Sequence, residues 1–273
     1  MIKAIKQKLS VCKAVAAVTY KEWSAYRTHS LVSVFVGPVY FIVQYFIWTA
    51  VYGDNGTLGG MELTHTIRYF GVIALIGYLT MDFADWNLQM LVGTGKFLTF
   101  ALRPMHHRFY ALSQKIGHRI LGFFLEFLPC FVIFRFLFKV DIIPLRIGWT
   151  VLSVGLAFLM NFYVNYCLGM TAFFLVRADG IRRVYQLAGS VLSGAMIPLS
   201  FFPEQLHLIM MFLPFQYTGY IPAMVWTGSE SIGALGLSIP QAVMCQGIAV
   251  LLAALLSEML YRASIKRFTA VGA

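Results

Sequence analysis

Six long apolar runs alternate with shorter polar segments along the 273-residue chain. A helix that crosses about 30 Å of hydrocarbon needs roughly 20 mostly apolar residues. The runs therefore predict six transmembrane helices, over residues 31–52, 69–89, 120–138, 149–174, 184–202 and 239–261. No polar stretch between them is long enough to fold separately, so we expect one transmembrane domain over residues 1–273. Its parts are an amphipathic N-terminal segment (1–30), a six-span bundle (31–261) and a tail (262–273).

The composition agrees with an all-α integral membrane protein. Hydrophobic residues make up 59% of the chain and charged residues 12%, where an ordinary soluble domain carries roughly 25% charge. Four cysteines lie far apart without a C-x-x-C pair, so the sequence favours structural thiols over a metal or redox site.

The basic residues predict the orientation of the spans, because cytoplasmic flanks carry an excess of Lys and Arg. Most of the 21 basic residues lie before the first run, between runs two and three, between runs four and five, or after the last run. Arg68, Lys139 and Arg146 lie in the alternate segments, and Arg135 lies within run three. Both ends of the chain are thus expected in the cytoplasm. The net charge of +10 follows this topology, which favours anionic lipids as partners and excludes nucleic acid.

The stretch between the last two runs, residues 203–238, is apolar in part but unsuited to a seventh span. Pro214 and Pro222 interrupt it, and it contains no Lys or Arg. A seventh crossing would also place the basic tail outside. We expect short helices that lie at, or dip into, the outer face.

Charged residues at membrane depth are functional candidates, because they are costly in lipid. They are Asp82, Asp85, Glu126, Arg135 and Glu258. The spacing of Asp82 and Asp85 predicts one helical face, either as a polar helix end or as an ion site. Glu126 and Arg135 are nine residues apart, about 13 Å along a helix, too far to pair. Glu258 is expected to pair with Arg262 at i+4.

No nucleotide or metal site is recognisable. Residues 93–97 faintly resemble a phosphate loop, but Met90 stands where its first glycine belongs and Phe97 where its hydroxyl belongs. His106 and His107 are adjacent without further ligands, which is typical of a surface loop. The chain is therefore not expected to be an enzyme by itself or to bind a cofactor, and nucleotide energy would come from another polypeptide.

Three features together resemble the permeases of type-2 ABC exporters. They are a basic amphipathic N-terminal segment, a long basic loop after run two and a Pro-broken outer segment. The outer segment carries the most specific spacing, at Gly194, Pro198, Phe202, Pro203, Pro214, Pro222 and Gly228. The tail from Tyr261 to Gly272 is similar to one branch of these permeases, often encoded as two related permeases with one ATPase.

The resemblance implies an interfacial elbow helix at the N-terminus and a coupling helix that docks into a separate ATPase, which binds ATP and Mg. The matching positions for ATPase contact are Lys96, Phe97, Leu102, Arg103, Pro104 and Arg108. A second permease, identical or related, would complete the transporter in a bacterial inner membrane. Spans one, two and five are expected to line the pathway, with candidates Tyr40, Gln44, Phe46, Trp48 and Met196.

Two other classes of function remain open at this point. An ion-coupled secondary transporter would use Asp82, Asp85 or Glu126 to carry protons, although no internal repeat is visible. A membrane enzyme has less support, because no nucleophile, base and metal ligands converge.

Overall fold

The computed structural model describes residues 2–25, 32–53, 56–102, 105–175 and 179–266. Apart from one short hairpin, these residues form helices and their connections. The first half contains α1 (Ile2–Ser24), α3 (Val36–Tyr52), β1 (Thr57–Leu58), β2 (Met61–Glu62), α4 (Leu63–Thr80), α5 (Ala84–Gly93), α6 (Leu98–Ala101), α7 (His107–Gly122) and α8 (Leu128–Val132). The second half contains α9 (Ile147–Gly169), α10 (Asp179–Leu192), α11 (Glu204–Met211), α12 (Tyr220–Thr227) and α13 (Ile239–Ile265).

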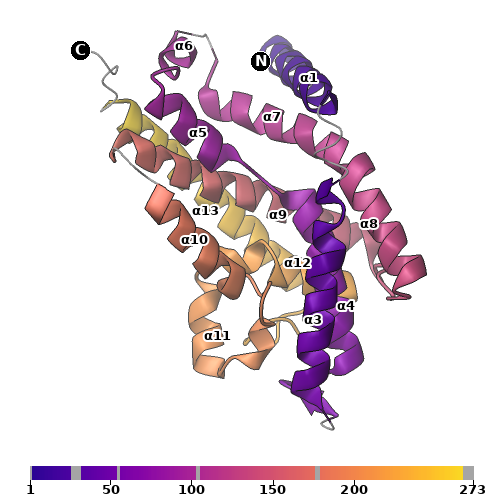
Figure 1. Cartoon of the computed structure of the whole chain (residues 1–273). Coiled ribbons are helices and arrows are strands. Elements are labelled where there is room, and N and C mark those ends of the chain that lie inside the picture. The colour runs from indigo at the N-terminus through magenta and orange to yellow at the C-terminus, as the bar shows by residue number, and fades with distance from the viewer. Residues whose placement is uncertain (1, 26–31, 54–55, 103–104, 176–178, 267–273) are drawn as a thin grey trace.

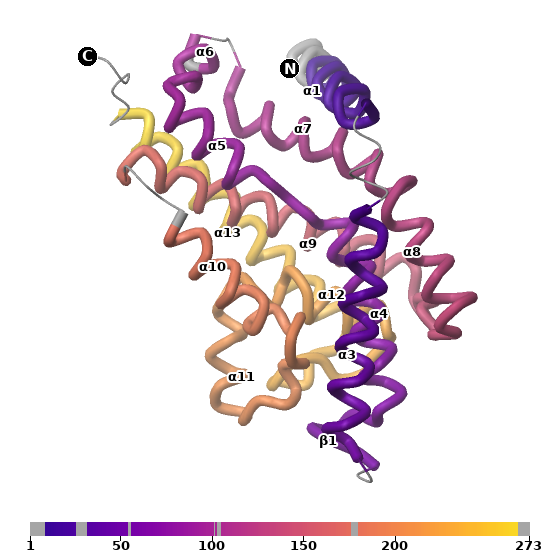
Figure 2. Tube along the Cα trace, viewed as in Figure 1, coloured from indigo at the N-terminus to yellow at the C-terminus, as the bar shows by residue number. Residues whose placement is uncertain are grey.

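The helices place the basic segments at one end of the molecule (Figure 1). The N-terminal helix α1, α6, the start of α7 and the end of α13 lie together there, whereas the β hairpin and α11 lie at the opposite end. The tube in Figure 2 follows the same arrangement, with α9 returning to the basic end before α10 begins. The alternation of basic and nonbasic segments is therefore reproduced in space.

Four helical stretches are long and apolar enough to cross a membrane: Leu63–Gly93, His107–Leu137, Ile147–Phe173 and Ile239–Ile265. They correspond to predicted runs two, three, four and six. A fifth candidate is the pair formed by Glu204–Met211 and Phe215–Thr227, bent by 78°. The helix α3 is apolar but only 17 residues long. A multi-pass membrane protein with four to five candidate spans is thus established within the described residues.

The fifth predicted span, residues 184–202, is wrong as a continuous helix. The helix α10 ends at Leu192, and Gly194 follows with a φ of +80°, a conformation that only glycine adopts without strain. The Cβ of Tyr220 would lie 3.2 Å from a Cβ at this position, so the chain turns where there is no room for a side chain. The preceding helix is strongly amphipathic rather than uniformly apolar.

The third span begins earlier than predicted. Residues 107–119 were expected to be part of a basic loop, but α7 begins at His107. Its helix then continues through two π-helical turns, Phe123–Phe127 and Ile133–Leu137, on either side of α8. Pro129 lies at the start of α8. Proline has no backbone N–H to donate within a helix, and the wider π-helical turn that precedes it makes room for its ring.

Residues 203–238 contain short helices, as the sequence predicted, and their position at the outer face stays a prediction. The helix α12 enters the bundle and packs against α4 and α9, with Tyr220, Ala223 and Val225 buried. Trp226 Nε1 donates a hydrogen bond to the carbonyl of Ile142 at 2.7 Å. Gln246 of α13 donates to the carbonyls of Ser153 and Tyr217, which ties this segment to α9.

The N-terminal helix α1 packs along α7 (Figure 2), and Gly117 of α7 lies against the backbone of Ala16 in α1. A Cβ at Gly117 would lie 2.8 Å from the Cα of Ala16, shorter than backbone atoms can tolerate. The absence of a side chain therefore fixes how closely the two helices meet.

Gly117→Val should consequently separate α1 from α7 and lower the stability by about 1–3 kcal/mol. Gly155→Val is the matched control, because nothing lies within 4 Å of a Cβ there. Thermal unfolding in mild detergent and tryptic cleavage within α1 would be measured for both. Equal melting temperatures and cleavage rates for the two variants would contradict this packing.

Candidate functional site

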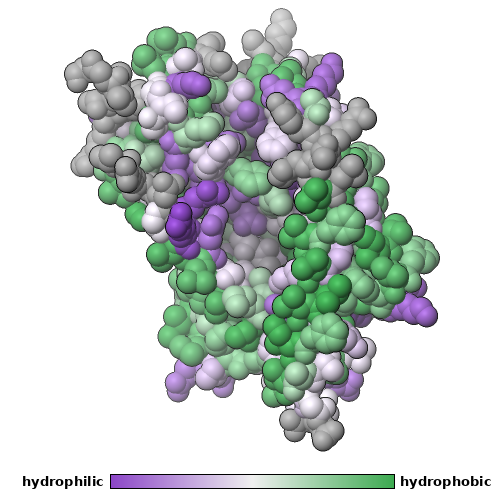
Figure 3. All heavy atoms as spheres, viewed as in Figure 1, coloured by the Kyte–Doolittle hydropathy of each residue, from purple (hydrophilic) through white to green (hydrophobic). Residues whose placement is uncertain are grey.

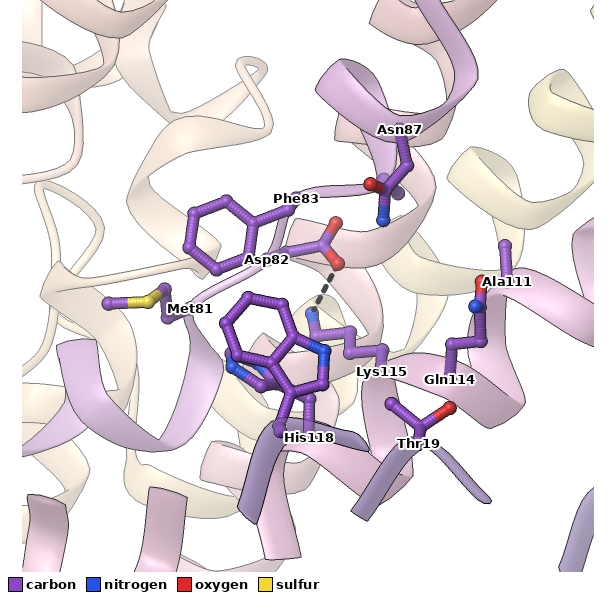
Figure 4. A pocket seen from close by; sticks show the side chains of 11 residues that line it. Thr19, Met81, Asp82, Phe83, Asn87, Ala111, Gln114, Lys115 and His118 are labelled. Atoms are coloured by element: carbon purple, nitrogen blue, oxygen red, sulfur yellow. Dashed lines mark ion pairs between the residues drawn. The ribbon is translucent and has the colours of Figure 1, made fainter. Parts of the chain in front are cut away.

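The long element formed by α4 and α5 is interrupted at residues 81–83. Helix α4 ends at Thr80, Met81 is extended (φ −44°, ψ 138°), and α5 begins at Ala84. Asp82 lies within this interruption, and its carboxylate points toward α7 (Figure 4). We call residues 81–83 the joint.

Asp82 is held by partners from two other helices. Lys115 Nζ of α7 lies 3.9 Å from Oδ1 of Asp82, and Asn165 of α9 donates a 3.2 Å hydrogen bond to Oδ2. Both charged side chains are only 3% exposed. Lys115 also donates to the carbonyl of Phe158 at 2.7 Å and lies over the Phe158 ring. The pair therefore joins the joint to α7 and α9.

A small cavity of about 50 Å³ opens beside this pair. The joint, α5 and α7 form most of its wall, and Thr19 and Trp23 of α1 complete it (Figure 4). The rings of Trp23 and His118 lie with their centroids 4.1 Å apart. A movement of α5 about the joint would change the shape of this cavity.

Asp85 has a different partner, and the prediction that Asp82 and Asp85 share one helical face is wrong. Asp82 lies outside the helix, whereas Asp85 lies in the first turn of α5. Its Oδ2 accepts a 2.5 Å hydrogen bond from Arg182 Nε of α10. The two carboxylates thus connect the start of α5 to α7 and to α10 respectively.

Glu126 belongs to a second buried pair. Arg119 Nη1 lies 3.3 Å from its Oε2 and donates to the carbonyl of Tyr78 at 2.6 Å, near the end of α4. Ser33 donates to Oε1 at 2.7 Å. Gly122 leaves room for this pair, since a Cβ there would lie 2.9 Å from Glu126 Oε2. The pair therefore secures the end of α4 to α7.

Arg135 lies apart from Glu126, as their spacing predicted. Its Nη1 is 3.8 Å from Asp141 Oδ1, and both side chains are well exposed. The predicted pair of Glu258 and Arg262 is confirmed, at 2.8 Å.

The predicted ATPase contact falls on an exposed corner formed by residues 94–102. Lys96 and Leu98 are exposed, and Leu102 is 81% exposed. Phe97 is buried, with its ring 5.4 Å from that of His107 and 5.0 Å from that of Phe173. The candidates Arg103 and Pro104 lie outside the described residues. We call residues 94–102 the α6 corner.

Arg108, another contact candidate, is directed into the bundle. Its guanidinium lies 3.0 Å from Glu258 and donates to Ser257 and to the carbonyl of Ala254. Its role in ATPase contact stays a prediction, but these bonds attach α7 to α13.

The histidine pair only partly fits the expected surface loop. His106 is exposed and lies 3.5 Å from Glu258. Desolvation lowers the pKa of His106, and the Glu258 carboxylate opposes this shift. The other histidine, His107, is buried, and its Nδ1 lies 3.0 Å from the hydroxyl of Tyr166.

The pathway candidates divide into two groups. Tyr40, Gln44 and Trp48 lie on the face of α3 that packs inward, where Trp48 donates to Gln44 at 2.9 Å and the Tyr40 hydroxyl donates to the carbonyl of Ala195. Phe46 and Met196 are exposed. The structure does not bring all five together, and their part in a pathway stays a prediction.

The basic partners of the carboxylates are what sequence reasoning missed. Lys115 and Arg119 were counted with a cytoplasmic loop, yet both are buried. Their i, i+4 spacing on an amphipathic stretch was the available signal, because it places both on one helix face. Asn165 and Ser33 gave no comparable signal.

The charged side chains of the site join helices to one another. No group of three or more His, Cys, Asp or Glu side chains able to hold a metal occurs among the described residues. Each of Asp82, Asp85 and Glu126 faces a basic side chain. These ion pairs link the helices on both sides of the joint.

These features define the class as a multi-pass helical membrane protein built around a jointed span. The sequence profile described as "ABC-2 family transporter protein" matches residues 39–272, and the chain belongs to this family. The resemblance to type-2 ABC permeases is thereby confirmed. Members of this family are membrane components of ABC transporters and are not themselves ATPases. No curated protein matches the chain. No solved structure matches it either.

The buried pair at the joint predicts strongly non-additive mutations. Asp82→Asn or Lys115→Met alone leaves an uncompensated buried charge and should cost about 3 kcal/mol. The double variant should lose clearly less than the two single losses combined. Unfolding by denaturant in mild detergent measures this coupling.

Asp141→Asn with Arg135→Gln provides the control for an exposed pair. Its coupling should stay below about 1 kcal/mol. Additive losses at Asp82 and Lys115 would show that the two charges do not stabilise one another.

Proposed function

We propose that the chain is the permease subunit of an exporter driven by a separate ATPase, which docks on the α6 corner. The observation that supports this best is the corner itself. It exposes Lys96, Leu98 and Leu102 at the basic end of the molecule (Figure 1), while Phe97 anchors it to the bundle. A corner that exposes apolar and basic side chains to a partner, and that is anchored to the bundle by a buried Phe97, is suited to transmit force from that partner.

The joint gives a route for that force. The α6 corner follows α5 directly, and α5 packs mainly on α9. At its other end α5 meets the joint, where Asp82 contacts Lys115 and Asp85 contacts Arg182. Movement of the corner would therefore turn α5 about the joint and shift α10 through Arg182, whereas α4 and α7 stay attached to one another through Arg119.

A second copy or a related permease would complete the pathway. Figure 3 shows a hollow between α3 and the α10–α11 side, with apolar side chains along both sides. Hydrophilic side chains gather over the beginning of α10, at one end of the hollow. The outer faces of α3 and α10 expose Val39, Phe46, Val184 and Leu187. Such faces suit contact with another subunit or with lipid.

The proposed orientation places the α6 corner, both termini and most basic residues in the cytoplasm of a bacterial inner membrane, with α1 as an interfacial elbow. Six crossings would then require α3 and the α10 region to span as well. The alternative, proton-coupled transport, is not favoured, because its three carboxylates already face basic partners.

Labelling of single cysteines tests this orientation. In a variant whose Cys12, Cys130, Cys167 and Cys245 are replaced by alanine, Thr99→Cys should react with an impermeant maleimide only after cell lysis. Lys139→Cys, at the other end of the bundle, should react in intact cells. The reverse pattern would overturn the orientation.

Disruption of the α6 corner tests the ATPase contact. The double variant Lys96→Glu/Leu102→Glu should lose most of the ATPase that co-purifies with the tagged chain, by about tenfold or more, because it places two acidic groups on the exposed tip. Lys139→Glu/Leu235→Glu makes the same changes on exposed residues elsewhere and should retain the ATPase.

Mass spectrometry identifies the partner, and melting temperature verifies folding. Failure to recover any nucleotide-binding subunit with the unaltered chain would refute the proposal.

A further inference from the structure

The chain leaves helical geometry between the end of α10 and the 3₁₀ turn Leu199–Phe201. Residues 193–198 make this connection, and we call them the α10 break. Gly194, with its left-handed backbone, is buried at the start of the break. Carbonyls outside a helix lack the N–H groups that a helix would supply, and at membrane depth water does not replace them. The α10 break therefore needs hydrogen-bond donors from neighbouring helices.

Two tyrosine hydroxyls supply these donors. Tyr69 of α4 donates to the carbonyl of Gly194 at 2.9 Å, and Tyr40 of α3 donates to the carbonyl of Ala195. Within the described ranges, these are the only hydrogen bonds that the two carbonyls accept. Tyr69 is fully buried and Tyr40 is half-buried. The α10 break is therefore held in place by α3 and α4.

The inward face of α3 extends this contact beyond the break. Trp48 lies two helical turns after Tyr40 on the same face, and its ring meets that of Phe201 edge to face, with centroids 5.0 Å apart. A Cβ at Gly59 of the β hairpin would overlap the Phe201 ring, so the hairpin also lies against this ring. The helix α3 thus closes on the chain from Ala195 to Phe201.

The tyrosine bonds cross a boundary between two groups of helices. Tyr78 of α4 accepts a 2.7 Å hydrogen bond from the amide of Gly37 and donates to the carbonyl of Val34 at 2.8 Å, which attaches α4 to α3. The helix α10 is attached instead to α5, through Arg182 and Asp85. The hollow in Figure 3 opens at this boundary, between α3 and the α10–α11 side.

We propose that the hydroxyls of Tyr40 and Tyr69 form a latch that closes the pathway between α3 and α10, and that both bonds are released when α10 moves. This inference rests on the proposed function, in which α5 draws α10 through Arg182. Hydrogen bonds weaken steeply when their geometry is disturbed, so a small displacement of the α10 break releases both. Each bond contributes only a modest net free energy, so the latch yields to a movement driven by an ATPase.

Hydrogen exchange at the amides of residues 194–202, measured by mass spectrometry on the full chain in nanodiscs, tests the latch. Tyr40→Phe and Tyr69→Phe each remove one hydroxyl and keep the ring. Each should speed exchange of these amides by at least about threefold, because the loss of one hydrogen bond makes local opening more frequent. The double variant should speed it by about tenfold. Equal exchange in the double variant and the unaltered chain would overturn the proposal.

Two matched variants separate the latch from the loss of any tyrosine hydroxyl. Tyr45→Phe makes the same change on the exposed face of α3 and should leave exchange at residues 194–202 unchanged. Tyr166→Phe removes a buried hydroxyl that lies 3.0 Å from Nδ1 of His107, and should speed exchange near His107 but not at the α10 break. If Tyr166→Phe acts on the α10 break as strongly as Tyr40→Phe, the effect is general destabilisation and the latch is refuted.

Dependence on nucleotide is a readout that a purely structural role would not change. In a complex whose ATPase binds but does not hydrolyse ATP, exchange at residues 194–202 of the unaltered chain should rise to about the level of the double variant without ATP. No rise with ATP would overturn the latch as a gate. The comparison of isolated chains needs no ATPase, so failure of the latch and failure of the proposed function are distinguishable.

Discussion

The rest of the structure depends on the burial of two opposite charges at an interruption in a long helix. Asp82 and Lys115 are nearly inaccessible to water, and charges at that depth persist only when they face each other and their remaining hydrogen bonds are made. Asn165 and the carbonyl of Phe158 supply those bonds. The need to pair these two buried charges fixes where α5, α7 and α9 meet. It therefore also fixes the position of the α6 corner, which follows α5.

A second constraint keeps the two halves of the interrupted span distinct. Arg119 bonds to the carbonyl of Tyr78 and to Glu126, which secures the end of α4. The start of α5 is held instead through Asp85 and Arg182. In the proposed mechanism, α5 turns about the joint, which Lys115 attaches to α7, while Arg119 keeps the end of α4 attached to the same helix. These contacts are the physical basis of the mechanism proposed for this member of the ABC-2 transporter family.

Sequence patterns predict the uniformly apolar helices well and the interrupted ones poorly. The helices α9 and α13 lie within a few residues of their predicted runs, because length and hydropathy alone specify them. The joint was not predicted, since Met81, Asp82 and Phe83 include neither Gly nor Pro. The carboxylates were found because charge in an apolar run is conspicuous. Their basic partners were not, because Lys115 and Arg119 are distant in sequence from Asp82 and were counted as loop residues.

The most direct test of the account is a distance between α5 and α7 during the ATPase cycle. Spin labels at Met90 and Ile120, both exposed, report this distance by double electron–electron resonance in the complex with its ATPase. A reference pair at Val43 of α3 and Thr64 of α4 reports the fixed half. The account predicts that ATP shifts the first distance and leaves the second unchanged. An unchanged first distance, in a complex that hydrolyses ATP, would contradict the joint as the element that transmits movement.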